Sequence, residues 1–184
     1  MEIIDDFLEQ KDFDELQTLM KNADLDWVYN DGIDFGTVDS DGVLSFSEEG
    51  DKDKFMFFHM FYYFFAPCST HFEKLTPIFQ IINPVSLYRI KANLLTRTSN
   101  IIENEFHTDI LGMSEKKLKQ WTTSIFYVNT NNGYTKFEDG TKVESIANRM
   151  VIFPANMKHT GTSCTDEKTR IVINFNYFSK HFCE

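Results

Sequence analysis

The run TRIVINFNYF, residues 169–178, is rich in β-branched and aromatic residues and strongly indicates a β-strand. Side chains alternate across a strand, so Arg170, Val172 and Asn174 share one face of this segment. The opposite face is apolar. This pattern has two interpretations: the polar face lies in solvent opposite a core face, or it lines a polar pocket inside a barrel.

Comparable runs recur between turn signals in the second half of the chain. They are SLYRIKANLLTRT (86–98), WTTSIFYVNT (121–130), GYTKFED (133–139), TKVESIA (141–147), NRMVIFPA (148–155) and KHTGTSC (158–164). We expect Asn131-Asn132-Gly133 and Asp139-Gly140, which lie between runs, to form hairpin turns. Many short strands of this kind predict an antiparallel barrel or jelly roll.

Helical patterns occur only before these runs. An amphipathic helix is expected to begin with Asp12 as its N-cap. A second helix is expected near Ser69, where Thr70 and Glu73 have the spacing of a capping box. Pro77 either kinks this helix or starts a fresh turn. The expected fold class is therefore mainly β (α+β), with N-terminal helices packed outside the strands.

The chain length of 184 residues fits one domain, residues 1–184. Residues 1–83 are expected to form a helical and strand support region, and residues 84–178 the β core. The run FMFFHMFYYFFAP (55–67) is too short to span a bilayer and reads as a buried strand or two.

Charge and cysteine content limit the partners and the compartment. The net charge is −10 and the pI is about 4.9, so the surface repels phosphate, and neither nucleic acid nor an anionic membrane is expected as a partner. Cys68, Cys164 and Cys183 are odd in number and widely spaced, which fits a reducing cytoplasm better than a disulfide framework. The N-terminus is acidic where a signal peptide would be basic. We therefore expect a soluble, cytoplasmic protein.

Two His-x-acid pairs occur in the chain, and their contexts differ. His71 and Glu73 fall in the first turn of the second expected helix, where residues two apart point in nearly opposite directions. His107 and Asp109 fall where a strand is expected, and residues two apart on a strand share a face. Only the second pair is therefore a candidate to hold a metal ion.

His159, at the start of another expected strand, is the candidate third ligand. Two His and one carboxylate on one face of a metal, with open positions, are typical of non-haem Fe(II) oxygenases. Arg170 follows on the next strand, and its guanidinium is suited to hold the far carboxylate of a dicarboxylate through two parallel hydrogen bonds.

In these residues the chain resembles the Fe(II)/2-oxoglutarate-dependent dioxygenases, specifically the prolyl-4-hydroxylase-like group. The resemblance rests on His107-Thr108-Asp109, SIFYVN (124–129), GYTKFEDGT (133–141), NRMVIFPANMKHTG (148–161) and Arg170, in that order. It covers roughly residues 84 to 178, and it implies a double-stranded β-helix, the cupin-like form of the jelly roll. In its overall sequence character the chain also resembles small oxygenases encoded by tailed phages, which would place the protein in a host cytoplasm.

The resemblance implies a role for each matching position. His107, Asp109 and His159 match the iron ligands, and Arg170 matches the residue that pairs with the C5 carboxylate of 2-oxoglutarate. Three further residues match pocket-lining positions around that cosubstrate: Tyr127, Asn174 and Arg97. The implied activity is hydroxylation of an unactivated C–H bond with Fe(II), 2-oxoglutarate and O2, giving succinate and CO2. The implied substrates are small molecules or peptides and proteins, with peptidyl proline among them.

Alternative interpretations remain at this point. TVDSDGVLSFSE (37–48) fits much of a calcium-binding EF-hand loop, although Thr37 stands where the first acidic ligand belongs, and a hairpin explains the same residues. A cupin-type metalloenzyme would keep the metal and not use 2-oxoglutarate, and a non-catalytic metal- or calcium-binding module would keep only the fold. The stretch ILGMSEKKLKQ (110–120) is expected to form a rim loop with solvated lysines, and Gly133 to Thr135 to line the opening of the pocket.

Overall fold

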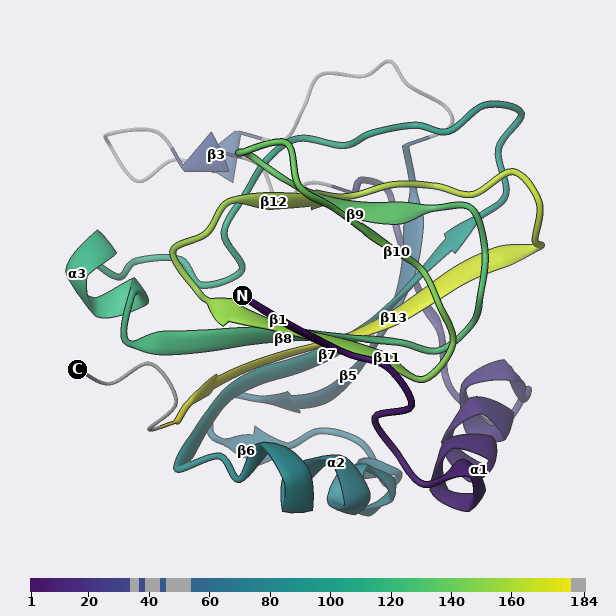
Figure 1. The fold of residues 1–184 in the computed structure, drawn as a ribbon, viewed down its shortest axis with the longest axis horizontal. Helices are drawn as coiled ribbons and strands as arrows, with labels where there is room; N and C mark the ends of the chain where they lie inside the picture. Colours follow the sequence, from purple (N-terminus) through teal and green to yellow (C-terminus); the bar gives the residue numbers. More distant parts are fainter. Residues whose placement is uncertain (34–36, 39–43, 46–53, 180–184) are drawn as a thin grey trace.

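The computed structural model describes residues 1–33, 37–38, 44–45 and 54–179. Two antiparallel sheets face each other in it, and two helices cover the outer face of the larger sheet (Figure 1). The mainly β fold with N-terminal helices outside the strands, expected from the sequence, is therefore confirmed. Among the described residues, no helix is long and apolar enough to cross a membrane.

The larger sheet has the strand order β1-β11-β8-β13-β7-β5-β2, and β6 pairs with β5. Its strands are β1 (Glu2–Ile4), β2 (Val28–Asn30), β5 (Met56–Tyr63), β6 (Ala66–Pro67), β7 (Ser86–Thr96), β8 (Trp121–Tyr127), β11 (Arg149–Pro154) and β13 (Thr169–Phe178). The smaller sheet consists of β10 (Lys142–Glu144), β9 (Tyr134–Phe137) and β12 (His159–Gly161), in that order. The run 55–67 forms β5 and β6, as its sequence predicted, but only β5 has buried residues; β6 is exposed, and Phe64 and Phe65 between them are 78% and 88% exposed.

The outer face of the larger sheet forms the main hydrophobic core beneath α1 (Gln10–Lys21) and α2 (Thr76–Ile82). The apolar residues of β13 lie here: Ile171, Ile173 and Phe175 are buried in the same cluster as Phe13 of α1 and Ile78 of α2. Burial of each such side chain stabilises the fold by about 1.5–3 kcal/mol. This core holds the larger sheet in place through its outer face, and the polar residues of β13 point from its inner face.

The inner face of the larger sheet looks toward the smaller sheet. A second core cluster, which includes Ile125, Phe153 and Val172, fills part of the space between them. Arg170 and Asn174, on the same face of β13 as Val172, are only 2% and 7% exposed. Of the two interpretations of the β13 pattern, the solvent-exposed polar face is therefore wrong, and the polar face points into the interior.

Both N-terminal helices begin differently from the prediction. Helix α1 begins at Gln10 after Glu9, so Asp12 lies in its first turn and is not the N-cap. In the second region a 3-10 helix (Phe72–Leu75) precedes α2, and Pro77 lies in the first turn of α2, where its missing N–H is tolerated. The capping box was wrong, because no side chain caps this 3-10 helix.

The two expected hairpin turns have different outcomes. Asp139-Gly140 joins the paired strands β9 and β10, and Gly140 has the positive φ of +91° that such a turn requires. Asn131-Asn132-Gly133 is not a hairpin, because β8 pairs with β11 and β13 whereas β9 pairs with β10 and β12. This segment instead crosses from the larger sheet to the smaller one.

Only part of the candidate calcium-binding stretch, residues 37–48, is described. β3 (Thr37–Val38) and β4 (Leu44–Ser45) pair antiparallel, as the hairpin interpretation of this stretch predicts. Its candidate ligands Asp39, Asp41 and Glu48 lie outside the described residues.

Asn148 ties the N-terminal segment to the larger sheet. It is 4% exposed and has φ +61°, and its side chain accepts from Leu8 N at 2.9 Å and donates to Leu8 O at 2.8 Å. We expect Asn148→Ala to lower the free energy of unfolding by about 3 kcal/mol, because two buried backbone groups lose their partners and alanine disfavours positive φ. Urea denaturation measures this. Asn148→Gly relieves only the backbone strain, so a full recovery of stability in that variant would contradict the hydrogen-bond explanation.

Candidate metal centre

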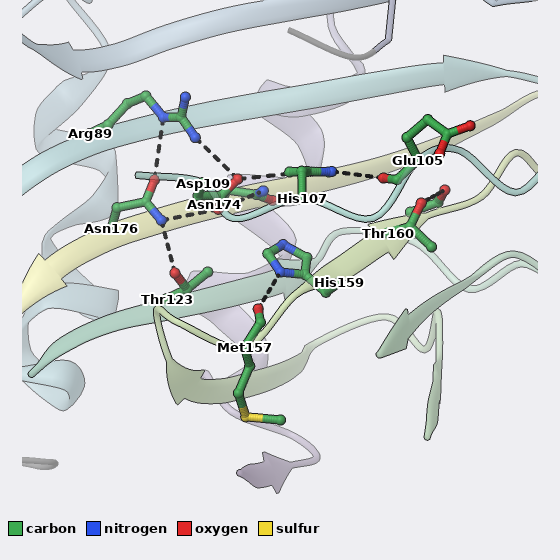
Figure 2. Close-up of polar contacts among 11 residues, drawn as sticks. Arg89, Glu105, His107, Asp109, Thr123, Met157, His159, Thr160, Asn174 and Asn176 are labelled. Carbon is green, nitrogen blue, oxygen red and sulfur yellow. Dashed lines mark hydrogen bonds and ion pairs between the residues drawn. The ribbon is translucent and has the colours of Figure 1, made fainter. Parts of the chain in front are cut away.

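Three side chains with metal-ligating atoms converge between the two sheets. The nearest ligand atoms of His107, Asp109 and His159 all lie within 4.8 Å of one another (Figure 2). A backbone bridge brings the two histidines together: each residue's N–H donates to the other's carbonyl oxygen, both at 3.0 Å. The two imidazole ring centroids are 5.1 Å apart. The residues proposed from spacing as metal ligands therefore do meet in space.

The local structure around His107 differs from the sequence expectation. His107 and Asp109 do not lie on a regular strand, because the segment between β7 and α3 (Glu115–Leu118) makes only isolated bridges. One of these bridges, to His159, determines the position of His107. The pair shares a direction because of this tertiary contact, and not because of a strand of its own.

Hydrogen bonds at Nδ1 orient both imidazoles so that Nε2 of each ring is available to a metal. Nδ1 of His107 lies 3.0 Å from Glu105 O, and Nδ1 of His159 lies 3.2 Å from Met157 O. A carbonyl can only accept, so each Nδ1 carries the proton and each Nε2 presents a lone pair. His159 Nε2 is buried and has no hydrogen-bond partner among the described residues, which is unfavourable unless an ion occupies that position.

The electrostatics also favour a neutral His159. Burial lowers its pKa to about 4, although the nearby Asp109 carboxylate opposes the shift. The imidazole therefore stays unprotonated at neutral pH, which is the form that binds metals. With an ionised carboxylate beside it, the donor set fits a divalent transition metal such as Fe(II).

Asp109 is held from its outer side by polar residues of β7 and β13. Its Oδ2 accepts from Asn174 Nδ2 at 3.3 Å and from Asn176 Nδ2 at 3.0 Å, and its Oδ1 lies 3.2 Å from Arg89 Nη2. Burial alone raises the pKa of Asp109, but the Arg89 guanidinium and the hydrogen bond from Asn176 hold that pKa well below its usual range. Asp109 is therefore an ionised carboxylate in a buried position.

Arg170 is a buried cation whose described hydrogen-bond acceptors are both neutral. Its Nε donates to Ser145 Oγ at 2.8 Å and its Nη2 to Thr135 Oγ1 at 3.1 Å, and both acceptors are neutral. Within the described part of the chain, no carboxylate forms an ion pair with it, and burial lowers its pKa. A Cβ on Gly161 would lie 3.4 Å from Nη1, so a glycine leaves room beside the guanidinium. An uncompensated buried charge is unfavourable, so this position is suited to an anionic ligand.

The three pocket-lining candidates occupy different places. The Tyr127 hydroxyl donates to Thr135 Oγ1 at 2.8 Å, so Tyr127 shares an acceptor with Arg170 and lies at that end of the interior. Asn174 lies at Asp109 instead. Arg97 is exposed beyond the end of β7, and the structure describes no side-chain contact between it and this buried group.

Of the three residues expected to line the opening, Gly133 and Thr135 lie beside Arg170, whereas Tyr134 does not. Gly133 packs against the stem of Arg170, where an added Cβ would lie 2.7 Å from Cδ, and Thr135 is buried beside the same guanidinium. Tyr134 points elsewhere and donates to Glu103 Oε1 at 2.6 Å. The 110–120 stretch was expected to be a loop, but Glu115–Leu118 form α3; its Lys116 and Lys117 are exposed, as expected for solvated lysines.

The inner face of β7 carries functional candidates that the sequence reasoning missed. Arg89, Lys91 and Asn93 alternate with Ile90, Ala92 and Leu94, and they lie opposite Asn176, Asn174 and Val172 of β13. The signal was present, because β7 shows the same polar and apolar alternation as β13. It could not be used before the register placed both polar faces on the same side of the sheet.

Lys91 is 3% exposed, and burial, followed by repulsion from Arg89, lowers its pKa to about 7 from an ordinary 10.5. Between these two values the unfolded chain binds a proton that the folded chain lacks, so Lys91 makes the free energy of unfolding rise with pH. The slope is at most about 1.4 kcal/mol per pH unit.

We expect Lys91→Met to remove this slope and to be the more stable protein at pH 7. Urea denaturation of both proteins at pH 7, 8 and 9 checks it; parallel pH profiles would contradict it.

Comparisons with known proteins identify the fold. No family model and no curated protein sequence matches the chain. Among solved structures, a prolyl hydroxylase from Trichoplax adhaerens, in complex with a hypoxia inducible factor peptide fragment, has a TM-score of 0.60 at 13% identity, covering 97% of this chain and 83% of that one. The viral collagen prolyl hydroxylase vCPH from Paramecium Bursaria Chlorella virus-1, a 2-oxoglutarate complex, has a TM-score of 0.51 at 14% identity, covering 97% and 96%.

A third similar structure is HygX from Streptomyces hygroscopicus, with nickel and 2-oxoglutarate bound. Its TM-score is 0.55 at 10% identity, and the match covers 97% of this chain and 82% of HygX. Identities this low establish the fold alone. The expected double-stranded β-helix is thereby confirmed, and the chain has the fold of Fe(II)- and 2-oxoglutarate-dependent oxygenases.

Proposed function

We propose that this protein is an Fe(II)- and 2-oxoglutarate-dependent dioxygenase that hydroxylates an unactivated C–H bond. The observation that carries the proposal is that a His-Asp-His cluster and the buried Arg170 guanidinium share one interior, and that no carboxylate of the described residues forms an ion pair with Arg170. The cluster offers three ligands for a metal, and Arg170 offers an anchor for a dicarboxylate. A cupin-type metalloenzyme that uses no dicarboxylate has no need of such a buried cation.

Each residue has a distinct part in this proposal. His107, Asp109 and His159 would hold Fe(II), which supplies the activation of O2 when it is bound. Arg170, aided by the Tyr127 hydroxyl, would bind and orient the far carboxylate of 2-oxoglutarate, and the apolar residues between the sheets would exclude water. The balanced reaction consumes substrate, 2-oxoglutarate and O2 and yields hydroxylated substrate, succinate and CO2.

The substrate is proposed to be a peptide or protein side chain, with peptidyl proline as the first test case. The support is that two of the similar structures are prolyl hydroxylases. We place the reaction in the cytoplasm, since Cys68 and Cys164 are free thiols. We also propose that residues 1–184 act as a single domain in which 84–178 carry the chemistry.

An anaerobic Fe(II) titration with and without 2-oxoglutarate tests the proposal. We expect a weak visible charge-transfer band that needs both components. Fe(II) binding without such a band would favour the cupin-type alternative, and no Fe(II) binding would overturn the metal site itself. Formation of hydroxyproline in proline-rich peptides, coupled to succinate, would then identify the substrate class.

A further inference from the structure

We propose that Arg89 is a positioning residue that fixes the metal-binding oxygen of Asp109 and favours the ferrous over the ferric state of the bound iron. This inference rests on the proposed function. Figure 2 shows the arrangement: Arg89 lies on the outer side of Asp109, away from the two histidines.

The hydrogen bonds give the two oxygens of Asp109 different tasks. Oδ2 accepts from the side-chain amides of Asn174 and Asn176, so its lone pairs are engaged. Oδ1 lies 3.8 Å from His107 Nε2 and forms an ion pair with Arg89 Nη2 at 3.2 Å, and no described hydrogen bond engages it. Oδ1 is therefore the oxygen available to a metal, and Arg89 is the cation beside it.

Arg89 is itself held by a rigid frame that spans three neighbouring strands. Its Nε donates to Asn176 Oδ1 at 3.3 Å, and Asn176 Nδ2 also donates to Thr123 Oγ1 at 3.1 Å. Arg89 of β7, Asn176 of β13 and Thr123 of β8 are direct cross-strand partners in the sheet register. The position of the guanidinium is thus set by the sheet and does not depend on a flexible loop.

A cation at this position affects the two oxidation states unequally. The Arg89 side chain is only 12% exposed, so solvent screens its charge weakly. Fe(III) carries one more positive charge than Fe(II) and is repelled more strongly by the guanidinium. At a separation of about 4 Å, a unit charge changes the relative affinity for the two ions about fivefold with the screening of bulk water and more where screening is weaker, so a change of about tenfold is expected here. The resting ferrous site is thereby protected from oxidation.

The test compares the Fe(III)/Fe(II) midpoint potential of the protein-bound iron in the wild type, Arg89→Gln and Arg89→Lys. In Arg89→Gln we expect Fe(III) to gain about tenfold in relative affinity, which lowers the potential by about 59 mV for a one-electron couple. Arg89→Lys keeps the charge and should keep the potential. Arg89→Met serves as a second uncharged variant if Arg89→Gln does not fold.

Arg149→Gln is the matched control. Arg149 also lies on the larger sheet, its side chain is 13% exposed, and it donates to both oxygens of the Asp5 carboxylate. That carboxylate belongs to no metal cluster among the described residues. The midpoint potential of iron bound to Arg149→Gln should therefore equal that of the wild type. An unchanged potential in Arg89→Gln, or an equal shift in Arg149→Gln, overturns this inference while leaving the proposed function intact. A wild type that binds no iron overturns both.

Discussion

His159→Ala is expected to lower the affinity for Fe(II) by more than about 100-fold, because it removes one of three ligands and loss of even an outer-shell partner has a 10–100-fold effect. The Nε2 atom that disappears is buried and has no partner in the described structure, so no protein hydrogen bond at Nε2 is lost. Anaerobic titration with Fe(II) measures the affinity, and the cosubstrate-dependent visible band should vanish.

His59 offers a matched control for this substitution. It is also buried, but its Nδ1 lies 2.8 Å from Asp26 O and its Nε2 lies 2.8 Å from Ser69 Oγ, so it is a fully satisfied core histidine, as its sequence context suggested. His59→Ala should lower the free energy of unfolding by about 1–3 kcal/mol and leave Fe(II) affinity unchanged. Equal Fe(II) affinities of wild type and His159→Ala would show that the cluster is structural.

Arg170→Met is expected to separate the two ligands of the proposed enzyme. Removing the guanidinium deprives the far carboxylate of 2-oxoglutarate of its partner, and loss of one member of a buried charge pair reduces binding by about 2–5 kcal/mol. Fe(II) affinity should be unchanged, since Arg170 contacts none of the three metal-ligating residues in the described contacts. Calorimetric titration of the metal-loaded protein with 2-oxoglutarate checks the first expectation.

Arg170→Met is also expected to change the free energy of unfolding of the ligand-free protein. The unfavourable burial of the Arg170 charge, which lowers its pKa, disappears with an apolar side chain, so the free energy of unfolding should rise by about 1 kcal/mol or more. Arg170→Lys is the control, because it keeps the charge and loses the two-pronged hydrogen bonding. If Arg170→Met binds 2-oxoglutarate as the wild type does, the dicarboxylate-anchor role is wrong.

The sequence by itself determined the strands and the identity of the candidate ligands. Alternation along β13 separated Arg170, Val172 and Asn174 from an apolar face, because side chains on a strand point alternately to its two sides. Residue type, spacing and the order of the motif blocks singled out His107, Asp109 and His159, although the strand expected around His107 and Asp109 did not form. These are local properties, readable from spacing and residue type.

Only the tertiary structure decided which face was interior and which residues surround the ligands. Pairing of β7 with β13 aligned Arg89 with Asn176, and the bridge to β12 placed His107, which no strand of its own could do. The crossing at residues 131–133, which resembled a hairpin, likewise depended on which strands pair. Local sequence sets the conformations that a segment prefers, but strand partners far apart in the chain are selected by the burial and hydrogen bonding of the whole sheet.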